Sequence, residues 1–151
     1  MLELARQADR EAVNALAADV HGMHVAWRPD LYRMPQELYP QDRFDEAVMQ
    51  RQLYCAKVDG VVAGYALLKI RDVDAPPLVR RRVMLIEEFC VDPICRGQGI
   101  GTLMVLEIRA LAKAFRCTDL QLGVYPQNDD AVGFWQKCGF TIRSIEMQCK
   151  A

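Results

Sequence analysis

Three glycines at alternate positions, Gly97, Gly99 and Gly101, stand between a mostly apolar run and a long segment with apolar residues at helical spacing. The run before them, VMLIEEFCV at 83–91, has the composition of a strand in the middle of a sheet. In the segment after them, one face of a helix collects Ile100, Leu103, Met104, Ile108 and Leu111. The sequence therefore predicts a central strand, a glycine-rich turn and a helix that begins near Gly99.

A turn of this kind is suited to bind an anion. The first turn of a helix leaves about four N–H groups unpaired and carries roughly half a positive charge. Glycines let an anion approach the backbone, and Arg96 adds a positive charge. A Walker A loop would need a lysine after Gly101, and a dinucleotide fingerprint would need G-x-G-x-x-G instead of G-x-G-x-G. From spacing alone, a tight turn without a ligand remains the alternative.

Hydrophobic periodicity and turn residues predict the other elements. Before the central strand they predict a short strand within 2–8, a helix capped by Asp9, a loop over 27–40 and a helix from Asp42 to about Gln52. A hairpin over 53–70 then turns at Asp59-Gly60, and a charged connection follows over 71–81. After the glycine turn and its helix they predict a strand over 119–125, a helix capped by Asn128 that ends near Gly139, and a last strand over 140–149. This order indicates one α/β (α+β) domain that spans residues 1–151.

Composition excludes several classes of protein. A net charge of -1 argues against a nucleic-acid-binding protein, and the chain has no apolar run of about 18 residues that could span a membrane. The N-terminus lacks the features of a secretory signal, so we expect a cytoplasmic protein. Six cysteines form no C-x-x-C pair and only two histidines accompany them, so we expect no metal site.

Two stretches resemble the signatures of the GNAT superfamily of N-acetyltransferases. In VDPICRGQGIG, the residues Arg96, Gly99 and Gly101 match the pattern R/Q-x-x-G-x-G/A. NDDAVGFWQKCGF is similar to the second signature, N-x-x-A-x-x-Φ-Y-x-x-x-G-F, and its matching residues are Asn128, Ala131, Phe134, Gly139 and Phe140. The resemblance covers nearly the whole chain. It implies the GNAT fold, with a mixed sheet of about six to seven strands, about four helices and a splayed strand pair that holds acyl-CoA.

The same resemblance implies acetyl-coenzyme A, or a related acyl-CoA, as the ligand. Its pyrophosphate would bind the N–H groups from Arg96 to Thr102, and its pantetheine arm would run beside the strand from Phe89 to Val91. The residues that the cofactor would contact are Phe89, Cys90, Val91, Arg96, Gly97, Gln98, Gly99, Ile100, Gly101, Thr102, Asn128, Phe134 and Trp135.

Family members usually transfer the acetyl group directly to an amine, which must first lose a proton. Glu87 and Glu88 are the candidates for this step. Counting by twos along the strand places Glu87 on the same face as Phe89 and Val91, so we favour Glu87 as the base or as an anchor for the amine. Glu88 is the reserve, because a bulge in the strand would shift the phase.

The chain departs from the family where the leaving thiolate is protonated. The family usually has a tyrosine at the position of Trp135, and an indole N–H is no practical acid. Tyr125 could supply a hydroxyl instead, or the thiolate could leave without a dedicated acid. The simplest role for Trp135 is packing beside the pantetheine.

Two functions follow from the resemblance. The leading one is an N-acetyltransferase that acts on a small molecule or on a peptide or protein amine; the other is a weakly active or inactive acyl-CoA sensor, which Trp135 favours. The segment 21–45 would form the acceptor wall, with possible contacts from His24, Asp30, Tyr32, Glu37 and Tyr39. A homodimer is compatible with the resemblance, although no sequence feature indicates one.

Overall fold

A computed structural model describes all residues, 1–151, as a five-stranded sheet with four α-helices. In chain order the elements are β1 (Leu2–Leu4), η1 (Gln7–Asp9), α1 (Arg10–Trp27), α2 (Gln41–Met49), β2 (Leu53–Val58), β3 (Val61–Val73), β4 (Arg81–Val91), η2 (Pro93–Cys95), α3 (Ile100–Ala114), β5 (Asp119–Leu122) and α4 (Asp129–Lys137). None of the helices is long and apolar enough to cross a lipid bilayer.

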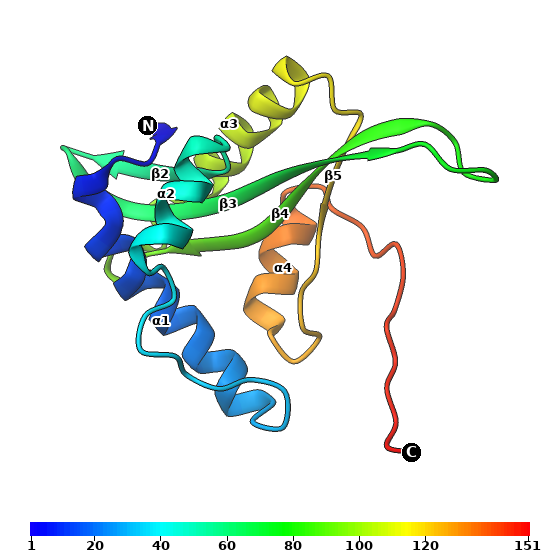
Figure 1. Cartoon of the computed structure of the whole chain (residues 1–151), viewed down its shortest axis with the longest axis horizontal. Coiled ribbons are helices and arrows are strands. Elements are labelled where there is room, and N and C mark those ends of the chain that lie inside the picture. The colour runs from blue at the N-terminus through cyan, green and yellow to red at the C-terminus, as the bar shows by residue number, and fades with distance from the viewer.

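The sheet is mixed, and its strands follow the order β1-β2-β3-β4-β5. The first four strands pair antiparallel, and β5 pairs parallel with β4. The hairpin of β2 and β3 turns at Asp59-Gly60, where both residues have a positive φ, as the sequence predicted. The far halves of β3 and β4 form a long ribbon that projects from the body in Figure 1.

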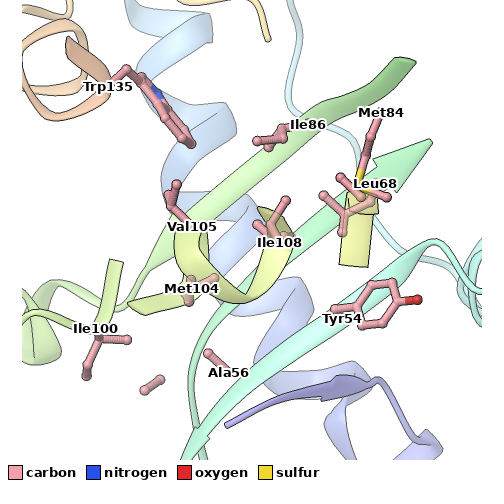
Figure 2. Packing of buried hydrophobic residues seen from close by; sticks show 13 residues of the cluster. Tyr54, Ala56, Leu68, Met84, Ile86, Ile100, Met104, Val105, Ile108 and Trp135 are labelled. Carbon is pink, nitrogen blue, oxygen red and sulfur yellow. The ribbon is translucent and has the colours of Figure 1, made fainter. Parts of the chain in front are cut away.

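Helices cover both faces of this sheet, so the fold has three layers. On one face, α3 and Trp135 of α4 pack on a cluster that includes Met84, Ile86 and Met104 (Figure 2). On the other face, α1 and α2 bury Val13 and Phe44 in a second cluster. The buried residues of α3 are Ile100, Met104, Val105, Ile108 and Ala112, so its apolar face is rotated away from Leu103, which is exposed.

A bulge interrupts the pairing of β3 and β4. Leu67 lies opposite Glu88, but the next residue, Leu68, lies opposite Ile86, so Glu87 is the extra residue. Before the bulge, Ile86 contributes to the cluster under α3; after it, Phe89 packs against the same cluster. The bulge therefore shifts the alternation of β4 by one residue, as an inserted residue must.

Several sequence predictions are wrong in detail. The stretch 140–149 forms no strand, and the sheet has five strands instead of six or seven. The charged connection is shorter than 71–81, because β3 continues to Val73 and β4 begins at Arg81. β5 ends at Leu122 instead of residue 125, and β4 pairs with it only as far as Ile86.

The caps of the first two helices also differ from the prediction. Asp9 does precede α1, but its carboxylate accepts the N–H of Arg6 and pairs with Lys57, instead of capping the helix. Asp42 lies inside the first turn of α2, which begins one residue earlier behind Pro40. At the other end of the chain, Asn128 caps α4 as predicted, because its side chain accepts the N–H of Ala131 at 3.2 Å.

Candidate active site

The N-terminus of α3 presents a row of backbone N–H groups without backbone acceptors. The first helical bond is donated by Leu103 to the carbonyl of Gly99, and the N–H groups of residues 97–102 donate to no backbone carbonyl. Gly97 and Gly99 have φ angles of 75° and 81°, which glycine adopts without strain. Apart from the glycine and its two chain neighbours, no residue has an atom within 4 Å of the place where a Cβ on either glycine would stand. This turn can therefore receive an anion directly on its backbone.

Two further residues shape this turn. Arg96 is exposed, and its Nε donates to the carbonyl of Val91 at 3.0 Å, so its charge is held beside the end of β4. Gly101 faces the core, where a Cβ would meet the ring of Phe134 at 3.2 Å. Gly101 thus lets α3 approach α4, whereas Gly97 and Gly99 leave the outer surface of the turn open.

The last residues of β4 have an edge that no strand pairs, although the carbonyl of Val91 accepts the Nε–H of Arg96. The N–H of Asp92 bonds to the carbonyl of Ala63, and backbone groups alternate between the two edges of a strand. Phe89 and Val91 therefore direct their backbone groups away from β3, toward the side of β5. Because the pairing with β5 stops at Ile86, an extended ligand could pair with this edge.

Glu88 is the most highly connected carboxylate near the bulge. Its Oε2 accepts hydrogen bonds from the hydroxyls of Tyr39 and Tyr65 at 2.8 and 2.9 Å, and its Oε1 accepts one from Arg43 at 2.8 Å. Burial, and then the charge of Glu88, raise the pKa of both tyrosines well above the usual range, so both hydroxyls remain donors. The side chain of Glu88 is half-buried and held from three directions.

Glu87 lies in a different environment. Its carboxylate is exposed and forms an ion pair of 2.7 Å with Lys69. Lys69 and Tyr65 lie on the same face of β3, because they are four positions apart and side chains alternate along a strand. Both glutamates thus contact residues of the face that carries α1 and α2, while Phe89 packs on the opposite face. The predicted common face of Glu87, Phe89 and Val91 is wrong, and the bulge is the reason.

Aromatic side chains gather between α1 and the loop after β5. The hydroxyls of Tyr125 and Tyr32 share a hydrogen bond of 2.5 Å. The centroid of the Tyr125 ring lies 5.6 Å from that of the His24 ring and 6.2 Å from that of the Trp27 ring. Burial lowers the pKa of His24, while the charge of Glu88 opposes this shift to a smaller extent.

Trp135 packs in the core, and its place beside the pantetheine stays a prediction. Its side chain is 8% exposed, and its ring lies 4.9 Å from Phe89, 5.0 Å from Phe134 and 5.1 Å from Phe140. Figure 2 shows its indole pointing into the cluster under α3. These contacts stabilise the junction of α4 with the end of β4.

The structure brings together some predicted residues and separates others. Tyr39 joins Glu88 and Tyr32 joins Tyr125, whereas Asp30 is paired with Arg28 and Glu37 with Arg10. Sequence reasoning missed Tyr65 and Arg43 as partners of Glu88. Tyr65 had a detectable signal, because a tyrosine in a buried strand usually needs a partner for its hydroxyl. Arg43 lies on an exposed helix and gave no such signal.

Comparisons with known proteins identify the family of this chain. The sequence profile of the acetyltransferase (GNAT) family matches residues 20–140. A glucosamine 6-phosphate N-acetyltransferase of Trypanosoma brucei brucei is 25% identical over 99 residues, which cover 64% of this chain and 63% of that protein. The peptidyl-lysine N-acetyltransferase YjaB of Salmonella typhimurium is 39% identical over 57 residues, or 38% of this chain and 36% of that protein. Each match spans less than two thirds of the relative's length.

Solved structures match over the whole chain. A mutant of the BH1408 protein from Bacillus halodurans has a TM-score of 0.94 at 26% identity and covers 100% of this chain and 99% of its own. The aminoglycoside N-acetyltransferase AAC(6')-Iy, solved in complex with CoA, has a TM-score of 0.71 at 16% identity and covers 100% of both chains. The second likeness concerns the fold alone. With the family profile matching 20–140, the chain belongs to the acetyltransferase (GNAT) family, whose members use acetyl-CoA.

Proposed function

We propose that this protein transfers an acetyl group from acetyl-CoA directly to a primary amine of a small molecule, a peptide or a protein. The observation that carries the proposal is the row of N–H groups at residues 97–102, which lies directly beyond the free edge of β4. In a CoA molecule a pyrophosphate links the adenosine to the pantetheine arm, which is an extended chain with two amides. The turn suits the pyrophosphate and the strand edge suits the pantetheine arm.

The fit of CoA to this surface rests on the chain's own groups. The N–H groups of residues 97–102 and the dipole of α3 would bind the pyrophosphate, and Arg96 would add a positive charge beside it. A side chain on Gly97 or Gly99 would occupy the open space where the phosphates approach. Phe89 and Val91 would pair with the amides of the pantetheine arm, and the splayed strand pair of the family would begin where β5 leaves β4.

Acetyl-CoA, when bound, supplies the acyl group as an activated thioester. A backbone N–H of the segment 89–91 would polarise the carbonyl of that thioester. Cys90 lies in the same segment, but burial raises the pKa of its thiol to about 11. The Cys90 thiol therefore stays protonated near neutral pH, which supports direct transfer to the amine over a cysteine-bound acyl group.

We assign to Glu88 the binding of the acceptor amine. Glu88 faces α1 and α2, and it is held by two tyrosine hydroxyls and Arg43. Such a carboxylate can anchor the acceptor ammonium and take its proton, directly or through a water molecule. Both glutamates form an ion pair, Glu87 with Lys69 and Glu88 with Arg43, but Glu87 is exposed and has no tyrosine donors. Glu87 is therefore the reserve candidate, which reverses the order that the sequence suggested.

Tyr125 is the residue to which we assign proton donation to the leaving thiolate. Its hydroxyl already shares a hydrogen bond with Tyr32, and its ring lies in the aromatic cluster beside His24. Trp135 is buried among three phenylalanines and has no titratable proton. A hydroxyl for this step must therefore come from outside α4.

The substitution at position 135 also supports a second candidate function. Without the family's tyrosine, the domain could bind acyl-CoA and signal its presence without turnover. This alternative shares the CoA site and differs only in the chemistry at Glu88 and Tyr125.

One assay separates the two functions. The purified protein is incubated with acetyl-CoA and a panel of polyamines, aminoglycosides, amino sugars, amino acids and lysine peptides, and free thiol is measured. Amine-dependent thiol release supports the transferase. Saturable CoA binding without release for any amine supports the sensor, and no CoA binding overturns both.

A further inference from the structure

The segment between α1 and α2, residues 28–40, contains no helix or strand, and it runs back along α1 in Figure 1. Tyr39, near the end of this segment, is nevertheless 0% exposed. The N–H and the carbonyl of Tyr39 bond to no other backbone group. Because buried backbone groups need hydrogen-bond partners, side chains must fix the position of this residue.

Asn14 of α1 supplies a partner for both groups. Its Oδ1 accepts the N–H of Tyr39 at 2.8 Å, and its Nδ2 donates to the carbonyl of the same residue at 3.0 Å. A side-chain amide carries an acceptor and a donor side by side, so it can pair with both backbone groups of one residue, as a neighbouring strand would. Arg10, one turn earlier on α1, donates to the same carbonyl at 3.1 Å.

The side chain of Tyr39 reaches the proposed active site. Its hydroxyl donates to Oε2 of Glu88 at 2.8 Å, and its ring packs edge-on against that of Tyr65, with the centroids 6.1 Å apart. The hydrogen bonds of Asn14 go to Tyr39 and to the carbonyl of Arg10, and none goes to Glu88. Tyr39 is thus the link between an amide on α1 and the carboxylate on β4.

The two tyrosine donors of Glu88 are held in different ways. Tyr65 lies within β3, and the pairing of this strand with β2 and β4 fixes its backbone. Tyr39 has no strand partner, and the amide of Asn14 takes the place of one. Loss of this amide should therefore release the Tyr39 hydroxyl from Oε2, while the Tyr65 hydroxyl stays in place.

We propose that Asn14 is a positioning residue for the transfer reaction, which orients the Glu88 carboxylate through the backbone of Tyr39. This role rests on the proposed function, in which Glu88 binds the amine and takes its proton. Since the amide acts through one hydroxyl, its effect on turnover should vanish when that hydroxyl is absent.

A double-mutant cycle with Tyr39→Phe tests this role, and amine-dependent thiol release measures turnover. Asn14→Ala and Tyr39→Phe should each lower kcat/KM for the amine about tenfold, and the double variant should lose no more than the worse single variant. The KM for acetyl-CoA should stay within about twofold of the wild type, because the CoA turn is not involved. A general loosening of the fold would change this KM as well.

Two further variants complete the test. Asn14→Asp keeps the acceptor for the Tyr39 N–H and loses only the donor, so it should lower kcat/KM less than Asn14→Ala; it takes the place of Asn14→Ala in the cycle if the alanine variant does not fold. Glu107→Ala is the matched control, because Glu107 on α3 also binds a backbone N–H of a distant segment, that of Leu2 at 2.7 Å. This control should lower the free energy of unfolding and leave turnover within about twofold of the wild type.

The outcomes separate the role of Asn14 from the proposed function. If the wild type acetylates no amine, or if Glu88→Gln leaves turnover unchanged, the assigned chemistry fails and the role of Asn14 fails with it. If Glu88→Gln lowers turnover but neither Asn14 variant does, the role of Asn14 alone is overturned. The same holds if the losses from Asn14→Ala and Tyr39→Phe multiply in the double variant.

Discussion

The hydroxyl of Tyr65 donates a hydrogen bond of 2.9 Å to Oε2 of Glu88, and this bond fixes the carboxylate on the α1 and α2 face of the sheet. Tyr65 itself is 1% exposed, so its side chain cannot move away from the carboxylate without disrupting the core. The bulge at Glu87 is what places Glu88 opposite Leu67 and on this face. The position of the proposed amine-binding carboxylate is thus set by a backbone irregularity and a buried hydroxyl.

Removal of this hydroxyl should lower turnover more than stability. In Tyr65→Phe, Glu88 loses one of its two tyrosine donors, and we expect kcat/KM to fall about tenfold because the carboxylate is less well positioned. The free energy of unfolding should fall by about 1 kcal/mol, the usual net value of one hydrogen bond. Thiol release and urea unfolding measure the two effects.

Tyr54→Phe is the matched control for this variant. Tyr54 is also buried in the sheet, but it belongs to the cluster under α3, on the other face. Its loss should leave turnover within about twofold of the wild type, since it does not contact Glu88. Equal losses of turnover in both variants would show that the effect on Tyr65→Phe is not mediated by Glu88.

The two adjacent glutamates should respond differently to the same substitution. Glu88→Gln removes the proposed proton acceptor, and we expect kcat/KM to fall by about 100-fold or more. Glu87→Gln breaks an exposed ion pair with Lys69, which contributes about 1 kcal/mol at most, and turnover should stay within about threefold. The reverse order of effects would return the role to Glu87.

Loss of the Tyr125 hydroxyl should lower kcat more than loss of the Tyr32 hydroxyl. Tyr125→Phe removes the proposed donor to the thiolate, and we expect kcat to fall about tenfold or more, with little change in the KM for acetyl-CoA. Tyr32→Phe removes only the hydrogen-bonded partner and keeps the Tyr125 hydroxyl, so its effect on kcat should be smaller. If Tyr125→Phe is fully active, the thiolate leaves without this donor.

The fold's stability should depend on pH through His24. Burial holds the pKa of His24 below its ordinary value of 6.5, so the unfolded chain binds the proton more readily than the folded one. Stability is therefore greatest above pH 6.5 and falls as the pH drops through 6.5 toward the folded-state pKa. Denaturant titrations between pH 7.5 and pH 5 should show this slope, and His24→Gln should reduce it. A slope unchanged by the substitution would contradict this assignment.

The central strand, the glycine turn and α3 could be predicted from the sequence because their signals are local. Alternate glycines, an N-terminal helix turn and apolar spacing all act within about 30 residues of chain. The hairpin at Asp59-Gly60 and the cap at Asn128 were predictable for the same reason. Each depends on a residue type whose backbone or side chain suits one geometry.

The sequence predictions that were wrong concern features that depend on residues far apart in the chain. The face of Glu87 could not be obtained by counting along β4, because the bulge is a property of its pairing with β3. The alternation in the tail predicted a strand over 140–149, but the tail forms none, and β5 is the last strand of the sheet. The network of Glu88 joins residues that are 23, 45 and 49 positions apart in the sequence.

The CoA site can be tested without knowing the amine acceptor. Gly99→Asp and Gly99→Asn introduce side chains of the same shape at a left-handed position that both residues tolerate better than most. They differ in one negative charge, which in the aspartate variant faces the proposed pyrophosphate. Both variants must first show the unfolding transition of a folded protein.

Calorimetric titration of acetyl-CoA into the wild type and these two variants is the most direct measurement. We expect saturable binding to the wild type and to Gly99→Asn, and binding to Gly99→Asp that is about tenfold or more weaker than to Gly99→Asn, because of charge repulsion at the helix terminus. Equal affinities of the two variants and the wild type would contradict the account, since the phosphates would then bind elsewhere.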